Sequence, residues 1–207
     1  MRLVLLGPPA SGKGTQAEQL VERLAVPKIS TGDMLRAARK AGTELGRQAD
    51  AFMAAGKLVP DEVVIGLVDE RLAGSDAKNG FILDGFPRTI PQAEALAALL
   101  ARQATPLDHV LQIDVPRDLL MERATLRRTD KRTGLIYHLK YSPPPPDAEL
   151  EHRADDREET VTKRLDEYEA MTAALLPYYE KLGLLRRIDG VGAPAEVTAR
   201  VMNALGV

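Results

Sequence analysis

Short runs of apolar and β-branched residues recur along the chain and predict strands. Each run ends at Gly, Asp, Ser or Pro, as buried strands commonly do. The runs are Arg2–Leu6, Phe81–Leu83, His109–Val115 and Leu184–Ile188, with a weaker one at Val26–Ile29. Their apolar character is largely continuous, which is typical of strands that are buried on both faces of a parallel sheet.

Helical periodicity fills much of the chain between these runs. Apolar residues repeat at i, i+3, i+4 and i+7 within Ala17–Leu24, and approximately so within Val64–Leu72. One apolar stripe from Val161 to Leu182 predicts the longest helix. The alternation of strands and helices predicts an α/β fold, in which helices flank a five-stranded parallel sheet.

The segment Thr31–Ala73 departs from this alternation. It predicts several short helices that are separated at Gly42, Gly56 and Pro60. Asp61 follows this proline and is expected to be the N-cap of the next helix.

A second departure is the polar segment Arg127–Asp156, which contains the run Pro143–Pro146. Such a run favours polyproline II structure and cannot enter a central strand. Both departures are excursions from the core, and excursions either close over ligands or decorate the surface. Composition alone favours neither interpretation.

Composition narrows the class of protein. The 207 residues are 44% hydrophobic and 28% charged, which predicts one folded domain with excursions. The net charge of −2 argues against a sequence-independent nucleic-acid binder or a binder of anionic membranes. The absence of cysteine excludes disulfide scaffolds, cysteine-ligated metal centres and thiol nucleophiles.

The apolar runs are too short to predict a membrane-spanning segment or a signal peptide. The longest apolar run, Ala95–Ala101, is far too short to cross a bilayer. The apolar run at the N-terminus is too short for a signal peptide. We therefore expect a soluble cytoplasmic protein.

The segment Gly7–Thr15 reads GPPASGKGT and directly follows the first predicted strand. It matches the Gly-x4-Gly-Lys pattern at the start of a helix, which is the context that gives the pattern its meaning. Glycines let backbone N–H groups approach phosphate oxygens, and the lysine and the helix N-terminus add positive charge. A nucleoside triphosphate is the predicted ligand.

Further motifs make the sequence resemble a family. Gly12–Gln16 resembles the nucleoside monophosphate kinases, and the motifs beyond it narrow the resemblance to the adenylate kinases. These further motifs are Ser30–Arg36, Gly56–Val59, Asp84–Thr89 with Gln92, Gly134–His138 and Arg153–Asp156. The resemblance covers nearly the whole chain.

The resemblance implies three parts and a reaction. Residues 1–29, 60–125 and 157–207 would form a P-loop core, 30–59 a helical insertion that binds the nucleoside monophosphate, and 126–156 a lid. The implied reaction is reversible phosphoryl transfer from MgATP to AMP, giving two ADP, with both insertions closing over the core. Closure would exclude water from the reacting phosphates.

Dispersed arginines fit this chemistry independently of the resemblance, because phosphoryl transfer needs alignment and neutralisation of spread negative charge. An isolated arginine is more often part of a surface ion pair. The resemblance implies a catalytic set of Lys13, Arg88, Arg123, Arg153 and Arg164. It implies ATP contacts from Ala10, Ser11, Gly12, Lys13, Gly14, Thr15, Arg123, Arg127, Ile136, Tyr137 and Gly192. It implies AMP contacts from Thr31, Arg36, Lys57, Leu58, Val59, Gly85, Phe86, Pro87, Arg88, Gln92, Arg153 and Arg164.

Two side chains bear on the choice of base and metal. Gln92 can donate and accept at once, which suits an adenine edge beside Thr31, but it could also be an exposed first-turn residue after Pro91. Asp84 would hold Mg²⁺ through water, as the resemblance implies, or could instead cap a turn. No general base is needed when the acceptor is already an ionised phosphate.

The sequence departs from the family pattern in the phosphate loop and in the lid. Ala10 stands where a glycine is usual, and we expect an ordinary φ there because a positive φ would cost alanine about 1 kcal/mol. Asp130 and Thr133 occupy the spacing at which zinc-bearing relatives have a Cys-x2-Cys pair. We expect a hydrogen-bonded polar knot in this segment, which also holds Tyr137 and His138, and no structural zinc. In the lid, the run Pro143–Pro146 also replaces a longer loop, so no second pair of ligand-like residues is evident.

Other functions are also compatible with a phosphate loop in an α/β fold. A UMP or CMP kinase of the same fold is the nearest alternative, although Thr31 with Gln92 and the full lid argue against it. An ATP-binding switch or a kinase of a non-nucleotide acceptor would leave Arg36, Arg88 and Gln92 unexplained. A monomer is expected, because no exposed apolar stripe is evident.

Overall fold

The computed structural model describes residues 1–207 and contains a central five-stranded parallel sheet. The strand order is β2-β3-β1-β4-β8, and every neighbouring pair runs parallel. The strands are β1 (Arg2–Leu6), β2 (Lys28–Ser30), β3 (Phe81–Asp84), β4 (His109–Asp114) and β8 (Leu185–Asp189). The predicted α/β class is confirmed, and each predicted strand matches an observed one within two residues at either end.

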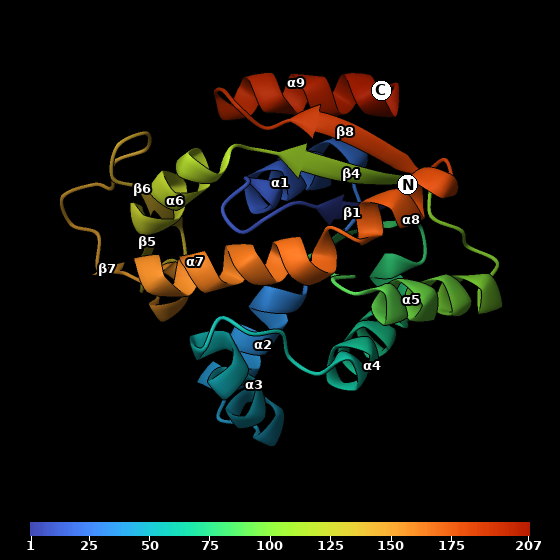
Figure 1. Ribbon diagram of the computed structural model, residues 1–207, viewed down its shortest axis with the longest axis horizontal. Coiled ribbons are helices and arrows are strands. Elements are labelled where there is room, and N and C mark those ends of the chain that lie inside the picture. The colour runs from blue at the N-terminus through green and yellow to red at the C-terminus, as the bar shows by residue number, and fades with distance from the viewer.

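Helices cover both faces of this sheet (Figure 1). They are α1 (Lys13–Leu24), α4 (Asp61–Leu72), α5 (Ile90–Arg102), α6 (Arg117–Thr125), α7 (Glu158–Glu167), α8 (Leu175–Lys181) and α9 (Pro194–Leu205). None of them combines the length and the apolar composition that a membrane-spanning helix requires.

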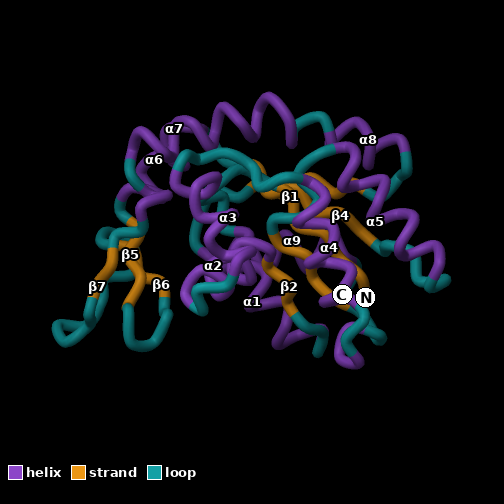
Figure 2. Tube along the Cα trace, turned by 90° about the horizontal axis from the view of Figure 1, so that it is seen from below, coloured by secondary structure: helices purple, strands orange, loops and turns teal.

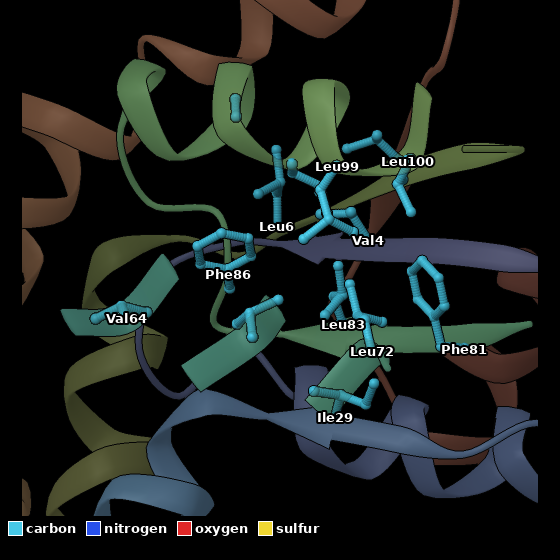
Figure 3. Close-up of a cluster of buried hydrophobic side chains, with 14 of the residues drawn as sticks. Val4, Leu6, Ile29, Val64, Leu72, Phe81, Leu83, Phe86, Leu99 and Leu100 are labelled. Atoms are coloured by element: carbon cyan, nitrogen blue, oxygen red, sulfur yellow. The ribbon is translucent and has the colours of Figure 1, made fainter. Parts of the chain in front are cut away.

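The central strand β1 shows why helices pack on both sides of the sheet. Its successive side chains point to opposite faces, because a strand has a period of two. Leu3 and Leu5 pack with α1 and α9 in one buried cluster, whereas Val4 and Leu6 pack with α4, α5 and α8 in another. Figure 3 shows the second cluster, with Val4 and Leu6 near Leu99 of α5. These four side chains of β1 are buried, whereas Arg2 at its start is only partly buried, which explains the continuous apolar run from Leu3 to Leu6.

The insertion between β2 and α4 consists of two short helices, α2 (Thr31–Lys40) and α3 (Glu44–Ala54). The predicted interruptions at Gly42 and Gly56 are confirmed, and both glycines have positive φ. The two helices pack closely at Gly46, where a Cβ atom would lie 2.3 Å from the backbone of Ala38. A larger residue at this position would therefore separate α2 from α3.

A second, antiparallel sheet with strand order β6-β5-β7 forms the polar excursion. Its strands are β5 (Arg127–Asp130), β6 (Ile136–His138) and β7 (Leu150–Glu151). Figure 2 shows these strands at one end of the molecule, apart from the main sheet. The run Pro143–Pro146 lies outside every strand, as predicted. The three short strands themselves were not predicted.

Two local predictions were wrong. The stripe Val161–Leu182 is not one helix, because a π-helical turn at Tyr168–Thr172 separates α7 from α8. Asp61 is not an N-cap: Pro60 occupies the cap position, and Asp61 is the first residue of α4. Its carboxylate binds side chains of the next helix instead, at Thr89 and Gln92.

Candidate active site

A cavity of about 1240 Å³ lies at the carboxyl ends of β1 and β3, at the start of α1. Ligands of open α/β sheets bind at this edge, where loops and helix N-termini converge. Its walls come from the phosphate loop, the α2–α3 insertion, the lid sheet and α7. The two excursions from the core therefore both face one cavity.

The phosphate loop turns sharply between β1 and α1. Gly7 has a φ of 149°, and a Cβ atom there would lie 2.7 Å from the carbonyl oxygen of Ile113, so only glycine fits. Gly12 is the N-cap of α1 with a φ of 97°. The ordinary φ predicted for Ala10 was wrong, because this residue has a φ of 63° in the left-handed region. The loop imposes this turn even without a glycine, so alanine carries backbone strain there.

Lys13 is held against the loop from which it projects. Its Nζ donates to the carbonyl oxygens of Gly7 and Pro8 at 2.7 and 2.8 Å, and to Ser11 Oγ at 3.4 Å. Burial lowers the pKa of Lys13 to about 8, and the nearby Asp84 carboxylate opposes this shift. The buried ammonium group therefore lacks a full counter-charge, and an anion would supply one.

Asp84 ends β3 and faces the first turn of α1. Its Oδ2 lies 3.8 Å from the position of a Cβ atom on Gly14. No hydrogen bond engages its carboxylate, so it does not cap a turn. No group of three or more acidic or histidine side chains could hold a metal ion by itself. One free carboxylate beside a phosphate loop fits Mg²⁺ that keeps most of its waters.

Arg88 and Arg164 lie in the same cavity and repel one another. Arg88 Nε donates to the carbonyl oxygen of Gly85 at 2.8 Å, and burial and then Arg164 lower the pKa of Arg88 to about 10. Burial also lowers the pKa of Arg164, although Asp155 opposes the shift from 3.1 Å. This concentration of poorly compensated cations favours a highly charged anion.

The remaining predicted arginines also line the cavity. Burial lowers the pKa values of Arg123 and Arg153. Arg123 donates to the carbonyl oxygen of Gly190 at 3.1 Å, whereas Arg36 pairs with Asp33 at 2.5 Å. Arg127 is different. Burial disfavours its charge, but a bidentate bond to Asp156 outweighs burial and raises its pKa.

Thr31 and Gln92 both line the cavity. Thr31 Oγ1 donates to the carbonyl oxygen of Gly85 at 2.9 Å. Gln92 is only 1% exposed, which excludes the alternative of an exposed first-turn residue. Its Oε1 accepts from the backbone N–H of Arg88, and its Nε2 donates to Asp61. Lys57, Leu58, Val59 and Pro87 line the same cavity.

The side chain of Phe86 lies elsewhere. It is 1% exposed and belongs to the hydrophobic cluster between the sheet and α4, in which Figure 3 shows it near Val64. It does not line the cavity, unlike its neighbours Gly85 and Pro87. Phe86 therefore contributes to the cavity only indirectly, because its buried side chain anchors the backbone that carries Gly85 and Pro87.

The lid side of the cavity includes two residues that were not predicted to contact a nucleotide. Ile136, Tyr137 and Gly192 line the cavity, and so do His138 and Tyr141, whose rings stack with centroids 4.6 Å apart. A Gly-x-x-Tyr-His motif alone gives no sign of this stack, because the stacking partner follows a turn.

The predicted polar knot is present in the lid. Asp130 is 3% exposed, and its Oδ1 accepts from the backbone N–H groups of Arg132 and Thr133 at 2.8 and 3.4 Å. Thr133 Oγ1 in turn accepts from the N–H of Leu135. Side chains and backbone thus close the turn between β5 and β6.

The comparisons with known proteins agree with this geometry. The family model "Adenylate kinase" matches residues 5–184 of the chain. The chain belongs to the adenylate kinase family. It is 61% identical over 209 residues to the adenylate kinase of Sorangium cellulosum (strain So ce56), covering 100% of this chain and 97% of that protein. It is 55% identical over 213 residues to the adenylate kinase of Moorella thermoacetica, covering 100% of this chain and 98% of that protein.

The resemblance inferred from the motifs is therefore confirmed. A third adenylate kinase, from Carboxydothermus hydrogenoformans, is 51% identical over 212 residues, covering 99% of both chains. An adenylate kinase transfers a phosphoryl group reversibly from ATP to AMP and produces two ADP, and this is the activity of the chain.

Proposed function

We propose that ATP binds along the phosphate loop and that Lys13 bridges its terminal phosphates. The supporting observation is that the Lys13 ammonium is buried and bonded only to neutral oxygens of its own loop. A phosphate would replace these partners and supply the negative counter-charge that the Lys13 ammonium lacks. Arg123 and Arg127 hold further phosphate oxygens, while Ile136 and Tyr137, with the Gly192 backbone, contact the adenine.

AMP binds at the opposite wall of the same cavity. Arg36 and Arg88 hold its phosphate, because a planar guanidinium group matches phosphate bidentately. Thr31 and Gln92 contact its base, with backbone groups of Lys57–Val59 and Gly85. Arg153 and Arg164 lie between the two nucleotides and neutralise charge on the transferred phosphoryl group.

Magnesium would be held by Asp84 through water and by the phosphates of ATP. When bound, the ion neutralises phosphate charge. Asp84 fits this role because its carboxylate is free and faces the start of α1. The carboxylate also offsets part of the positive charge around Lys13.

Residues 30–59 and 126–156 act as two closing parts over a core of 1–29, 60–125 and 157–207. Both excursions line the cavity, so their movement toward the core would exclude water from the reacting phosphates. The enzyme works as a cytoplasmic monomer, with ATP, AMP and ADP as its partners and neither a nucleic acid nor a membrane. It carries no structural zinc.

One observation carries these assignments: a single cavity is lined by all the predicted nucleotide-contact residues except Phe86, and it contains a cluster of mutually repelling cations. The test is ADP formation from ATP and Mg²⁺ with AMP, CMP or UMP, beside a control without acceptor. We expect fast turnover with AMP alone. Turnover with CMP or UMP instead would refute the base assignment, and equal ADP formation without an acceptor would refute the two-substrate site.

The phosphate assignment has its own test. Arg88→Ala is expected to lower kcat by more than a hundredfold while the circular dichroism spectrum is unchanged, because the arginine stabilises charge in the transition state. Arg102→Ala is the matched control, since this arginine is exposed on α5. Unchanged activity in Arg88→Ala would refute its role.

A further inference from the structure

Asp61, Thr89 and Gln92 form a closed hydrogen-bonded ring beside the cavity. Asp61 Oδ1 accepts from Gln92 Nε2 at 2.7 Å, and its Oδ2 accepts from Thr89 Oγ1 at 2.7 Å. Thr89 Oγ1 also accepts from the backbone N–H of Gln92 at 3.3 Å. Thr89 and Gln92 are 5% and 1% exposed, so solvent does not substitute freely for these bonds.

The ring decides which way the Gln92 amide faces. A carboxylate accepts hydrogen bonds and does not donate them, so it binds the NH₂ end of the amide and repels the oxygen end. On the other side, the backbone N–H of Arg88 donates to Gln92 Oε1 at 2.7 Å. Both neighbours therefore impose the same orientation, and the reverse orientation would leave two buried mismatches.

The fixed amide still has bonding capacity. An NH₂ group has two donors and an amide oxygen has two lone pairs. Asp61 uses one donor and Arg88 one lone pair, and no other protein group bonds to either atom. One donor and one acceptor of known position thus remain for a ligand in the cavity that Gln92 lines.

We propose that Asp61 is a positioning residue that sets acceptor specificity by locking the Gln92 amide in the orientation that matches adenine. The inference rests on the proposed contact between Gln92 and the AMP base. The 6-amino group of adenine donates and its N1 accepts, whereas a 6-oxo purine presents the opposite pattern. A locked amide favours adenine and rejects the 6-oxo purine, whereas an amide that can rotate by 180° accepts both bases.

The position of Asp61 suits this task. It is the first residue of α4, directly after the insertion that lines the AMP side of the cavity. Val64, Val68 and Leu72 anchor α4 in the core cluster, so the carboxylate is presented from a fixed helix. Thr89 is the N-cap of α5, which carries Gln92. The ring thus connects two rigid helices.

The test compares AMP with IMP, its 6-oxo counterpart, as phosphoryl acceptor. In Asp61→Ala we expect the KM for AMP to rise about tenfold and the AMP-over-IMP ratio of kcat/KM to fall about tenfold, as when a buried bond is lost. The kcat at saturating AMP and the KM for ATP should change less than about twofold. Asp61→Asn keeps one acceptor for Gln92 Nε2 and should restore most of the preference. Asp69→Ala, on the exposed face of the same helix, is the matched control.

A double-mutant comparison separates this inference from the proposed base contact. If Asp61 acts through Gln92, Asp61→Ala should have no further effect on the AMP-over-IMP ratio in a Gln92→Ala background. If Gln92→Ala loses the preference but Asp61→Ala keeps it, the inference is wrong and the base contact stands. If Gln92→Ala itself keeps the preference, the base contact is wrong and the inference fails with it.

A measurement on the unaltered protein covers the case in which Asp61→Ala does not fold. The Gln92 side-chain amide proton that faces Asp61 should exchange slowly with solvent in NMR spectra, with and without AMP. Its partner proton should become protected only when AMP is added. Rapid exchange of both protons in the AMP complex would overturn the proposal.

Discussion

Arg127 donates two hydrogen bonds to the Asp156 carboxylate, one of them from Nε to Oδ2 at 2.8 Å. Arg127 is the first residue of β5, and Asp156 ends the 3-10 turn that follows β7. The pair therefore joins the two ends of the segment that carries the second sheet. Asp156 is fully buried, so the pair is shielded from solvent on the carboxylate side.

Loss of this carboxylate should destabilise the protein strongly. Asp156→Ala would leave the Arg127 guanidinium without its bidentate partner, and we expect a loss of about 3 kcal/mol in the free energy of unfolding. Urea denaturation measures the change. Asp147→Ala removes an exposed ion pair with Arg132 of the same segment and should cost far less. Similar losses in the two variants would contradict the importance of the pair.

The affinity for ATP should decrease at alkaline pH because Lys13 loses its proton. Its pKa of about 8 in the empty site is below the ordinary lysine value, and a bound triphosphate would raise it. Below pH 8, Lys13 of the free enzyme is already protonated. Above pH 8, Lys13 must take up a proton when ATP binds, so the affinity for ATP falls as the pH rises, by a factor that approaches about tenfold per pH unit. Calorimetry in buffers of different ionisation enthalpy should detect this uptake. Equal ATP affinity at pH 7 and 9.5 would contradict it.

Replacing Ala10 by glycine should stabilise the protein. Alanine at a φ of 63° costs about 1 kcal/mol. Glycine removes this strain, but part of the gain is lost because the unfolded chain becomes more flexible. We expect a net gain of about 0.5 kcal/mol in thermal or urea unfolding. Ala41→Gly is the control, because Ala41 has a φ of −76° and its replacement should destabilise. A loss of stability in both variants would argue against strain in the loop.

The lid turn should withstand metal chelators but not the loss of Asp130. Strong zinc chelators are expected to leave the melting temperature unchanged, since side chain and backbone already close this turn. Asp130→Ala removes the buried carboxylate that accepts two backbone N–H groups of this turn, and it should cost about 1 kcal/mol. A drop of several degrees on chelation would show that a metal ion stabilises the lid.

The sequence predicted those parts of the fold that local pattern determines. The central strands β1, β3 and β4 are short apolar runs whose side chains are largely buried on both faces. The phosphate loop lies where Gly7, Gly12 and Lys13 indicated it. The order of the strands was not predicted, because pairing between distant segments leaves no trace in local periodicity. The lid strands were missed for a related reason: β5 is polar, with the sequence RRTD, and β7 has only two residues.

Errors within the site have a common physical cause. Ala10 has a strained φ because the loop geometry is set by its surroundings and overrides the residue's own preference. Asp61 looked like a helix cap because proline precedes it, but its partners lie 28 and 31 residues away on α5. Such long-range partners become visible only when the helices have been placed beside one another.

The crowding of cations around Lys13, Arg88 and Arg164 has a consequence for the lifetime of the enzyme. Burial, and then repulsion by neighbouring arginines, lowers the pKa values of these three groups in the empty cavity, so the folded protein contains repulsion that anionic ligands relieve. Any ligand that binds only the folded state shifts the folding equilibrium toward it. Nucleotides therefore protect the enzyme as well as react on it, and proteases will degrade it fastest when a cell has exhausted its adenylates.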